Sequence, residues 1–198
     1  MSEMLKIGFI KLAVVLVTIM VSFGTAYAQN VDLTSEKEQE PFGNLDKTPQ
    51  LGHVVYGRQP DEATIPMLKE RGFTHIVSVR YDDEPANFDA RKVIEDNGMT
   101  FTQISYLKGS IKDPASERTV DDASLTLIKN LLEETANNDG KVLLHCASGQ
   151  RAAAALGSIL YRDYGYSKDD ARAYAEKAGL TSKNTGAIYD RYIEGLNK

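Results

Sequence analysis

The single cysteine of the 198-residue chain, Cys146, lies in a segment whose residue types suit nucleophilic chemistry, HCASGQR at 145–151. The apolar run before it predicts a strand, and the alanine-rich stretch 152–160 after it predicts a helix. The N–H groups of the loop and of the helix N-terminus would converge near the sulfur and could bind a tetrahedral oxyanion. These donors and the Arg151 guanidinium also favour the thiolate, which is the nucleophilic form. The alternative is that Cys146 is a small buried hydrophobic residue.

The letters HCASGQR resemble the active-site signature of cysteine-dependent phosphatases, in which a glycine lies three positions after the cysteine and an arginine follows. Those enzymes have five residues between cysteine and arginine, whereas Cys146 and Arg151 enclose four, the loop length of rhodanese-type sulfurtransferases. A four-residue loop is also similar to that of a bacterial phosphatase-like family, related to the phosphatase domain fused to some β-lactamase-like hydrolases. This resemblance covers roughly residues 54–196 and implies the tyrosine and dual-specificity phosphatase fold.

The resemblance implies a role for each residue of the segment. The Cys146 thiolate would attack the phosphorus of a phosphate monoester, and water would hydrolyse the resulting phosphocysteine. Arg151 and the loop residues would bind the equatorial oxygens, the loop residues being Ala147, Ser148, Gly149 and Gln150. His145 would orient the loop through a backbone hydrogen bond, although it could equally be an ordinary histidine at a strand end. No metal or organic cofactor is required, since positioning and electrostatics carry this chemistry.

A phosphatase of this kind also needs a general acid for the leaving oxygen, and dual-specificity relatives use an aspartate some thirty residues before the cysteine. Asp113 lies 33 positions before Cys146, in the loop 108–118, and is our candidate. The alternative is that Asp113 and Pro114 merely form a turn. Four other aspartates could substitute for it, namely Asp82, Asp83, Asp121 and Asp122.

Two other functions fit part of the pattern. A sulfurtransferase would carry sulfane sulfur on Cys146 as a persulfide, and the loop length favours it. A non-catalytic anion-binding module would keep the loop without turnover. Ala152 is compatible with that second alternative, because tyrosine phosphatases usually have a serine or threonine after the arginine to assist departure of the thiolate. The substrate could be a phosphorylated small molecule, lipid or protein.

The elements that must position these residues alternate along the chain. We expect helices at 61–71, 87–97 and 120–135, and strands at 75–79, 100–106 and 142–144. After the loop, helix follows helix, with Ser167 capping one that extends to Lys177 and a last one ending near Leu196. A rhodanese domain would have another strand there. The sequence thus predicts a single three-layer α/β domain, a mainly parallel sheet flanked by helices, with binding residues at the carboxyl ends of its strands.

The first 28 residues are typical of a cleaved signal peptide: Lys6 and Lys11 precede the apolar stretch 12–23, and Ala26-Tyr27-Ala28, with a small residue at each end, marks a cleavage site. An uncleaved anchor is the alternative, but the stretch is short for a bilayer. We expect a periplasmic or secreted protein without a membrane anchor after cleavage. Residues 29–50 are expected to be a flexible leader and 51–198 the catalytic domain.

The net charge of −5 disfavours a nucleic-acid partner, and removal of residues 1–28, which carry two lysines and one glutamate, makes it more negative. One cysteine cannot form an internal disulfide bond. His53 and His75 have no metal-ligand spacing to each other or to Cys146, so no metal site is expected.

Overall fold

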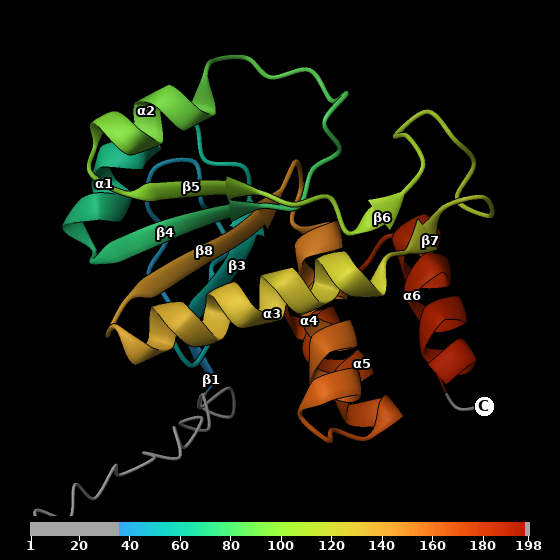
Figure 1. Cartoon of the computed structure of the whole chain (residues 1–198). Coiled ribbons are helices and arrows are strands. Elements are labelled where there is room, and N and C mark those ends of the chain that lie inside the picture. The colour runs from blue at the N-terminus through green and yellow to red at the C-terminus, as the bar shows by residue number, and fades with distance from the viewer. Residues whose placement is uncertain (1–35, 197–198) are drawn as a thin grey trace, which may run out of the picture.

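A six-stranded sheet forms the centre of the protein in the computed structural model, which describes residues 36–196 (Figure 1). The strand order is β1-β2-β3-β8-β4-β5, and the last four of these strands are parallel. The two antiparallel strands β1 and β2 extend the sheet on one side. The bounds are β1 Glu36–Glu38, β2 Pro49–Leu51, β3 Val54–Arg58, β8 Lys141–Cys146, β4 Phe73–Ser78 and β5 Thr100–Gln103.

Helices cover both faces of this sheet. Two short helices, α1 (Thr64–Glu70) and α2 (Ala90–Asp96), lie on one face. On the other face, α3 (Asp122–Asn137) and α4 (Gln150–Asp163) contact the sheet, and α5 (Lys168–Lys177) and α6 (Lys183–Leu196) pack against α4. Two further strands, β6 (Leu107–Lys108) and β7 (Thr119–Val120), form a small antiparallel pair at the two ends of the loop 109–118. The expected three-layer α/β architecture is therefore confirmed.

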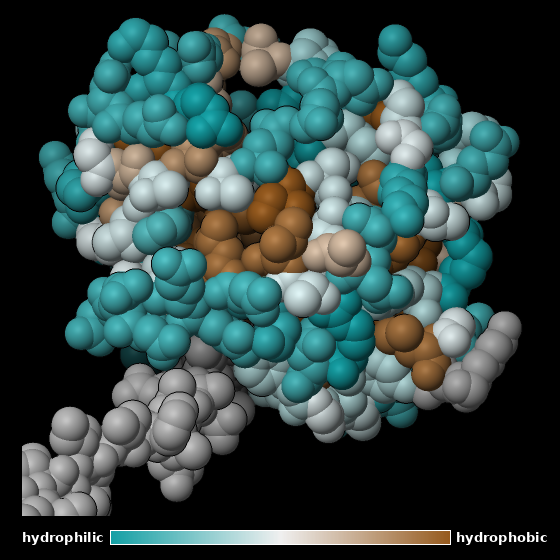
Figure 2. Space-filling view, viewed as in Figure 1, coloured by the Kyte–Doolittle hydropathy of each residue, from teal (hydrophilic) through white to brown (hydrophobic). Residues whose placement is uncertain are grey.

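The central strand β8 is buried on both faces, which explains its apolar sequence. Leu143 packs into a core cluster with residues of α1 and α2, whereas Val142, Leu144 and Cys146 belong to the cluster beneath the four larger helices. This division follows from the strand geometry, because successive side chains point to opposite faces. The alternation therefore directs Cys146 toward α4 and His145 toward the other face. Outside the core, the helix surfaces on the face seen in Figure 2 are mainly hydrophilic.

Most of the expected elements are present with shifted ends. The first helix begins only at Thr64, whose amide donates to the Asp61 carboxylate at 2.9 Å. The second begins at Ala90 because Asp89 caps it, accepting from the Lys92 amide at 3.0 Å. Ser167 caps α5 as expected, accepting from the Asp170 amide at 3.1 Å.

Residues 36–50, which we expected to be flexible, belong to the folded domain. They supply β1 and most of β2, and they bury Phe42 and Leu45 against α1 and the sheet. The ring of Phe42 packs 6.5 Å from that of Phe73, and the Thr48 hydroxyl donates to the Gln39 carbonyl at 2.8 Å. Two apolar residues in a polar segment give a weak sequence signal, yet both are buried in the core. The proposed signal peptide lies outside the described residues, and no helix among 36–196 is long and apolar enough to span a bilayer.

Candidate active site

The loop 146–151 connects the end of β8 to the start of α4 at the carboxyl edge of the sheet. Gly149 forms its sharp turn in the left-handed region, with φ of 88°. A Cβ atom at this position would lie 3.3 Å from the carbonyl of Gly57, at the end of β3. The amide of Gln59 approaches the Ala147 carbonyl at 3.5 Å. Glycine is therefore required both by the backbone conformation and by the contact with β3.

The structure brings Cys146 and Arg151 together, both buried, at the two ends of this loop. Burial alone would lower the pKa of Arg151, but its hydrogen bonds with Glu84 and its interaction with the Cys146 side chain raise that pKa above the usual value. The guanidinium is therefore a permanent cation next to the sulfur. A thiolate at Cys146 and an anion bound in the loop would both be stabilised by it.

Glu84 fixes the orientation of Arg151. Its two carboxylate oxygens accept from both terminal nitrogens of the guanidinium, one of them at 2.9 Å, and its carboxylate also accepts from the Arg80 Nε at 3.1 Å and the Tyr81 amide at 2.9 Å. Burial by itself would raise the pKa of Glu84, but these hydrogen bonds lower it to about 2. Glu84 is thus an ionised carboxylate that holds both Arg80 and Arg151, and Arg151 interacts with the Cys146 sulfur.

Glu84 was not among the site residues predicted from the sequence. The available signal was its place in the charged segment 80–84, directly after β4. Because β4 pairs in parallel with β8, the loops that follow these two strands meet at the same edge of the sheet. We considered Asp82 and Asp83 of this segment, but only as general acids.

Two tyrosines complete the surroundings of Arg151. The Tyr106 hydroxyl is buried and donates to the Arg151 carbonyl at 3.0 Å, which fixes the first turn of α4. The Tyr81 ring lies 5.3 Å from the Arg151 guanidinium and 5.9 Å from that of Arg118. Both distances fall within the range of cation–π contacts. These contacts leave the arginine little freedom to rotate.

His145 has the backbone contact that the expected orienting role requires. Its Nδ1 lies 3.3 Å from the Cys146 carbonyl oxygen, and because a carbonyl only accepts, Nδ1 carries the proton. Its Nε2 is buried without a hydrogen-bond partner among the described residues. Burial lowers the pKa of His145 to about 4, so the ring is neutral at physiological pH. With its side chain on the far side of β8 from Cys146, it is not placed to act as a base.

Asp113 lies in a loop that is tied to the segment carrying Glu84. The Ser110 hydroxyl donates to Asp83 at 2.6 Å, and Arg118 donates to the Asp113 carbonyl while its guanidinium faces Tyr81. The Asp113 carboxylate itself accepts from the Ser110 amide at 2.6 Å. Asp113 therefore forms a turn, which we considered as the alternative to a role as general acid. The loop that carries this turn borders the site. The role of Asp113 as general acid stays a prediction.

The other candidate aspartates have contacts of their own. Asp121 caps α3 and pairs with Lys108, Asp122 pairs with Arg162, and Asp82 accepts from Gln103.

Gln150 ties the loop to the turn between α5 and α6. Its side-chain carbonyl accepts from the Thr181 and Ser182 amides, each at 2.8 Å, and its amide nitrogen donates to the Thr181 hydroxyl at 3.0 Å. Ala152 is fully buried and offers no hydroxyl near the sulfur. No cluster of potential metal ligands occurs within residues 36–196.

Comparison with known proteins supports this description at the level of fold. No family model and no curated protein matches the chain. Among solved structures, the chain is similar to TpbA from P. aeruginosa in complex with pTyr, with a TM-score of 0.58 and 17% identity over 80% of this chain and 88% of that one. The chain has the fold of the tyrosine and dual-specificity phosphatases.

Two further similar structures have the same fold. For Tk-PTP in its active form the TM-score is 0.53, with 20% identity over 72% of this chain and 92% of the other. For PTPMT1 in complex with PI(5)P the TM-score is 0.56, with 13% identity over 73% and 92%. The expected resemblance to dual-specificity phosphatases is thereby confirmed for the fold.

Proposed function

We propose that the protein is a cysteine-dependent phosphatase that hydrolyses phosphate monoesters through a phosphocysteine. The observation that carries this proposal is the pairing of Cys146 with Arg151 across a tight loop at the carboxyl edge of the sheet, with Glu84 holding the arginine in place. A nucleophile, a fixed cation and converging N–H groups are the components that phosphoryl transfer needs. The phosphatase fold of the similar structures supports the same reading.

In the first step, the Cys146 sulfur forms a bond to phosphorus while the bond to the leaving oxygen breaks. Arg151 and the loop N–H groups stabilise the charge that spreads over the equatorial oxygens. The leaving oxygen takes its proton from the carboxyl group that we assign to Asp113. In the second step, water attacks phosphorus, the sulfur–phosphorus bond breaks, and the proton returns to that carboxylate. The products are an alcohol or phenol and inorganic phosphate, and Cys146 is regenerated.

The substrate is a phosphorylated molecule outside the cytoplasm, since we also propose that residues 1–28 direct export to the periplasm or the medium. The similar structures were solved with ligands as different as pTyr and PI(5)P, so the fold alone does not select between a protein and a lipid substrate.

Sulfur transfer is the second candidate, because the loop encloses four residues between cysteine and arginine. The element order opposes it, since α4 is followed by α5 and α6 with no further strand within the described chain. The two reactions share the nucleophile and the anion-binding loop, so they must be separated by substrate.

The test is to assay the purified protein with an aryl phosphate and, separately, with thiosulfate and cyanide. We expect aryl phosphate hydrolysis that is abolished in Cys146→Ser and reduced about 100-fold or more in Arg151→Ala. Arg162→Ala, an arginine of α4 that pairs with Asp163, is the matched control and should retain activity. Turnover of thiosulfate without hydrolysis of the phosphate ester would contradict the proposal.

A further inference from the structure

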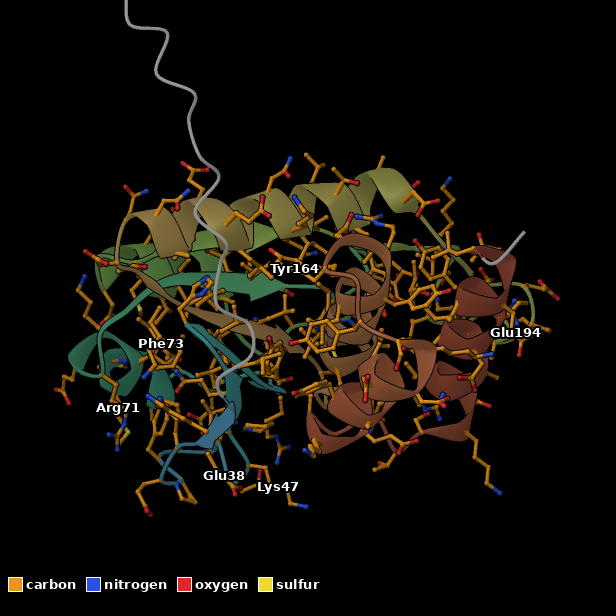
Figure 3. All side chains as sticks on the ribbon, turned by 90° about the horizontal axis from the view of Figure 1, so that it is seen from below. Glu38, Lys47, Arg71, Phe73, Tyr164 and Glu194 are labelled. Atoms are coloured by element: carbon orange, nitrogen blue, oxygen red, sulfur yellow. The ribbon has the colours of Figure 1, made fainter. Side chains whose placement is uncertain are left out.

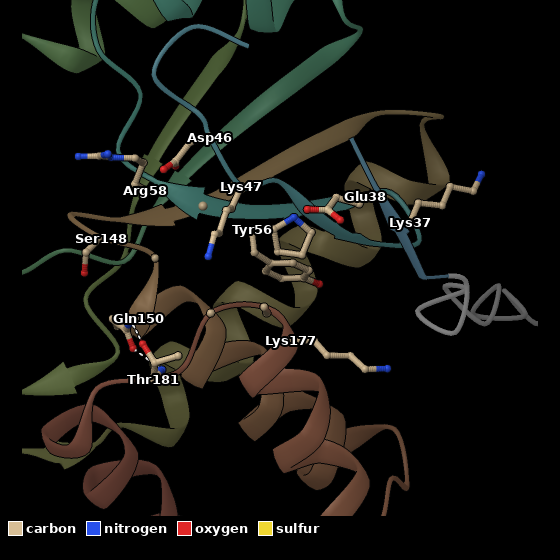
Figure 4. A pocket seen from close by; sticks show the side chains of 15 residues that line it. Lys37, Glu38, Asp46, Lys47, Tyr56, Arg58, Ser148, Gln150, Lys177 and Thr181 are labelled. Carbon is tan, nitrogen blue, oxygen red and sulfur yellow. Dashed lines mark hydrogen bonds between the residues drawn. The ribbon is translucent and has the colours of Figure 1, made fainter. Parts of the chain in front are cut away.

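Two cavities adjoin the carboxyl edge of the sheet, and they differ in their relation to the nucleophile. The larger, of about 790 Å³, is lined in part by Glu38 and Lys47, which project on the side of the molecule away from α3 (Figure 3). Figure 4 shows Gln150 on its other wall, but neither Cys146 nor Arg151 belongs to the lining. The smaller cavity, of about 500 Å³, reaches the residue that precedes the nucleophile.

The smaller cavity lies between the ends of β4 and β5 and the segment 79–89, which arches from β4 to α2 in Figure 1. Phe101 and Gln103 of β5 and the first turn of α2 supply further walls. Ser78 and His145 are paired in register on β4 and β8, and with exposures of 1% and 2% they form the buried end of the cavity. The volume is that of a site for a small organic molecule.

His145 offers a hydrogen-bond acceptor at this buried end. Its Nδ1 proton is donated to the Cys146 carbonyl, so its Nε2 carries a lone pair, and Nε2 has no hydrogen-bond partner within the described part of the chain. Burial lowers the pKa of His145, and the nearby Arg80 guanidinium adds to this effect, so the ring stays neutral. A ligand that reaches Nε2 must therefore donate a hydrogen bond. A neutral hydroxyl is favoured over an ammonium there, because burial and Arg80 would oppose a second positive charge.

The charges nearer the surface of the cavity favour a cation. Both arginines of the lining, Arg80 and Arg91, are already paired with glutamates. Asp82 and Asp89 also line the cavity and are exposed, and neither takes part in an ion pair anywhere in the chain that the structure describes. Each uses its Oδ1 in one hydrogen bond and has its Oδ2 left for a ligand. Two carboxylates at one cavity would attract a protonated amine.

The remaining lining is apolar. Ala86, the half-buried Phe88 and the buried Phe101 all contribute to it. A short hydrocarbon stem that packs against these side chains gains free energy from burial. The lining as a whole therefore matches a molecule with a hydroxyl at one end, a hydrocarbon stem and a protonated amine at the other end.

We propose that this cavity is a binding site for a small amino alcohol, whose hydroxyl donates to His145 Nε2 and whose ammonium faces Asp82 and Asp89. The His145 and Cys146 side chains lie on opposite faces of β8, so the site is separate from the anion-binding loop. It nevertheless adjoins that loop, because Nδ1 of the same imidazole ring contacts the Cys146 carbonyl. The inference does not depend on the proposed phosphatase reaction.

The test titrates the purified protein with a series of amino alcohols from ethanolamine to aminohexanol and follows the NMR resonance of the His145 Nε2 nitrogen. We expect a saturable shift of this resonance with at least one member of the series. The matched amine without the hydroxyl should bind about fivefold more weakly and leave the resonance in place, because it cannot donate to Nε2. The matched alcohol without the amine should bind about tenfold more weakly, because it loses the attraction to two carboxylates.

Variants test the carboxylates without changing a buried residue. In Asp82→Asn/Asp89→Asn, affinity for the amino alcohol should fall about tenfold, whereas affinity for the matched alcohol should stay the same. Asparagine is itself a good cap residue, so the start of α2 is retained. Asp96→Asn, which changes an exposed aspartate at the other end of α2, is the matched control and should leave both affinities unchanged.

Each contrary outcome would overturn a stated part of the proposal. The absence of any shift of the His145 resonance across the series would reject the site, as would displacement of the amino alcohol by orthophosphate, which would place it in the loop. Equal affinity for the amine without the hydroxyl would reject the contact with His145. Unchanged affinity in the double variant would reject the role of the two carboxylates. A protein that binds the amino alcohol as expected but hydrolyses no phosphate ester would refute the proposed function alone.

Discussion

Replacing Glu84 by glutamine tests whether this carboxylate positions Arg151 for binding phosphate. Glu84 accepts hydrogen bonds from Arg151, Arg80 and the Tyr81 amide, and the side chains of Glu84 and Arg151 are 6% and 9% exposed. Glutamine has one acceptor oxygen in place of two and no charge. The variant therefore leaves two neighbouring guanidinium groups without their counter-ion.

The size of the effect follows from that loss. Removing one partner of a buried ion pair costs about 3–5 kcal/mol, and the remaining carbonyl oxygen should reduce this to about 2–3 kcal/mol. For a domain of this size, such a change lowers Tm by about 5–10 °C. Because Arg151 is then free to leave its orientation, we expect kcat/KM for an aryl phosphate to fall about 100-fold and orthophosphate to bind more weakly.

The assay measures thermal unfolding, kcat/KM and the Kd for orthophosphate on the same preparations. Glu117→Gln, which changes an exposed glutamate in the loop before β7, is the matched control and should leave all three unchanged. A Glu84→Gln protein that melts at lower temperature but keeps its phosphate affinity and its kcat/KM would show that Glu84 only stabilises the fold. That result would refute the positioning role.

Further predictions concern the loop, the acid and the pH dependence. Gly149→Ala should lower the free energy of unfolding by about 1–2 kcal/mol and weaken orthophosphate binding, both measurable by denaturation and calorimetry, because a side chain is strained at a φ of 88°. Ala152→Ser should speed hydrolysis of the phosphocysteine, so a pre-steady-state burst seen in the parent protein should shrink. Asp113→Asn should lower turnover of alkyl phosphates far more than that of activated aryl phosphates, and equal losses would exclude it as the acid. Stability should fall as the pH is lowered through two windows, because the unfolded chain takes up each proton first. Between about 6.5 and about 4 the loss comes from His145 together with His53 and His75, whose pKa values burial also lowers, and between about 4.5 and about 2 it comes from Glu84. His145→Asn should reduce the slope of the upper window in pH-dependent denaturation.

Local patterns in the sequence predicted much of the fold. The cap residue Ser167 and the apolar periodicities fixed the type and order of the central elements, and β8 with its loop and α4 lies where the letters around Cys146 predicted. These features depend on residues close together in the chain, so periodicity and capping rules detect them.

Contacts between residues far apart in the sequence were harder to predict. Glu84 lies 67 positions before Arg151, and only the parallel pairing of β4 with β8 brings the two together. The prediction for segment 36–50 was wrong for a related reason, since its composition is polar on average although the two apolar side chains Phe42 and Leu45 are buried in the folded domain. Composition describes a segment by its average, whereas burial is decided residue by residue.

The two antiparallel strands at the N-terminal side of the sheet have a practical consequence. Gln50 and Leu51 of β2 pair with Val55 and Val54 of β3, so β3 has a neighbour on each side. A shortened chain beginning at residue 52 would leave β3 at the rim, with a row of unpaired backbone donors and acceptors and an apolar sequence. Such strands recruit strands from other molecules and promote aggregation. Expression trials of this protein should therefore retain residues 36–51.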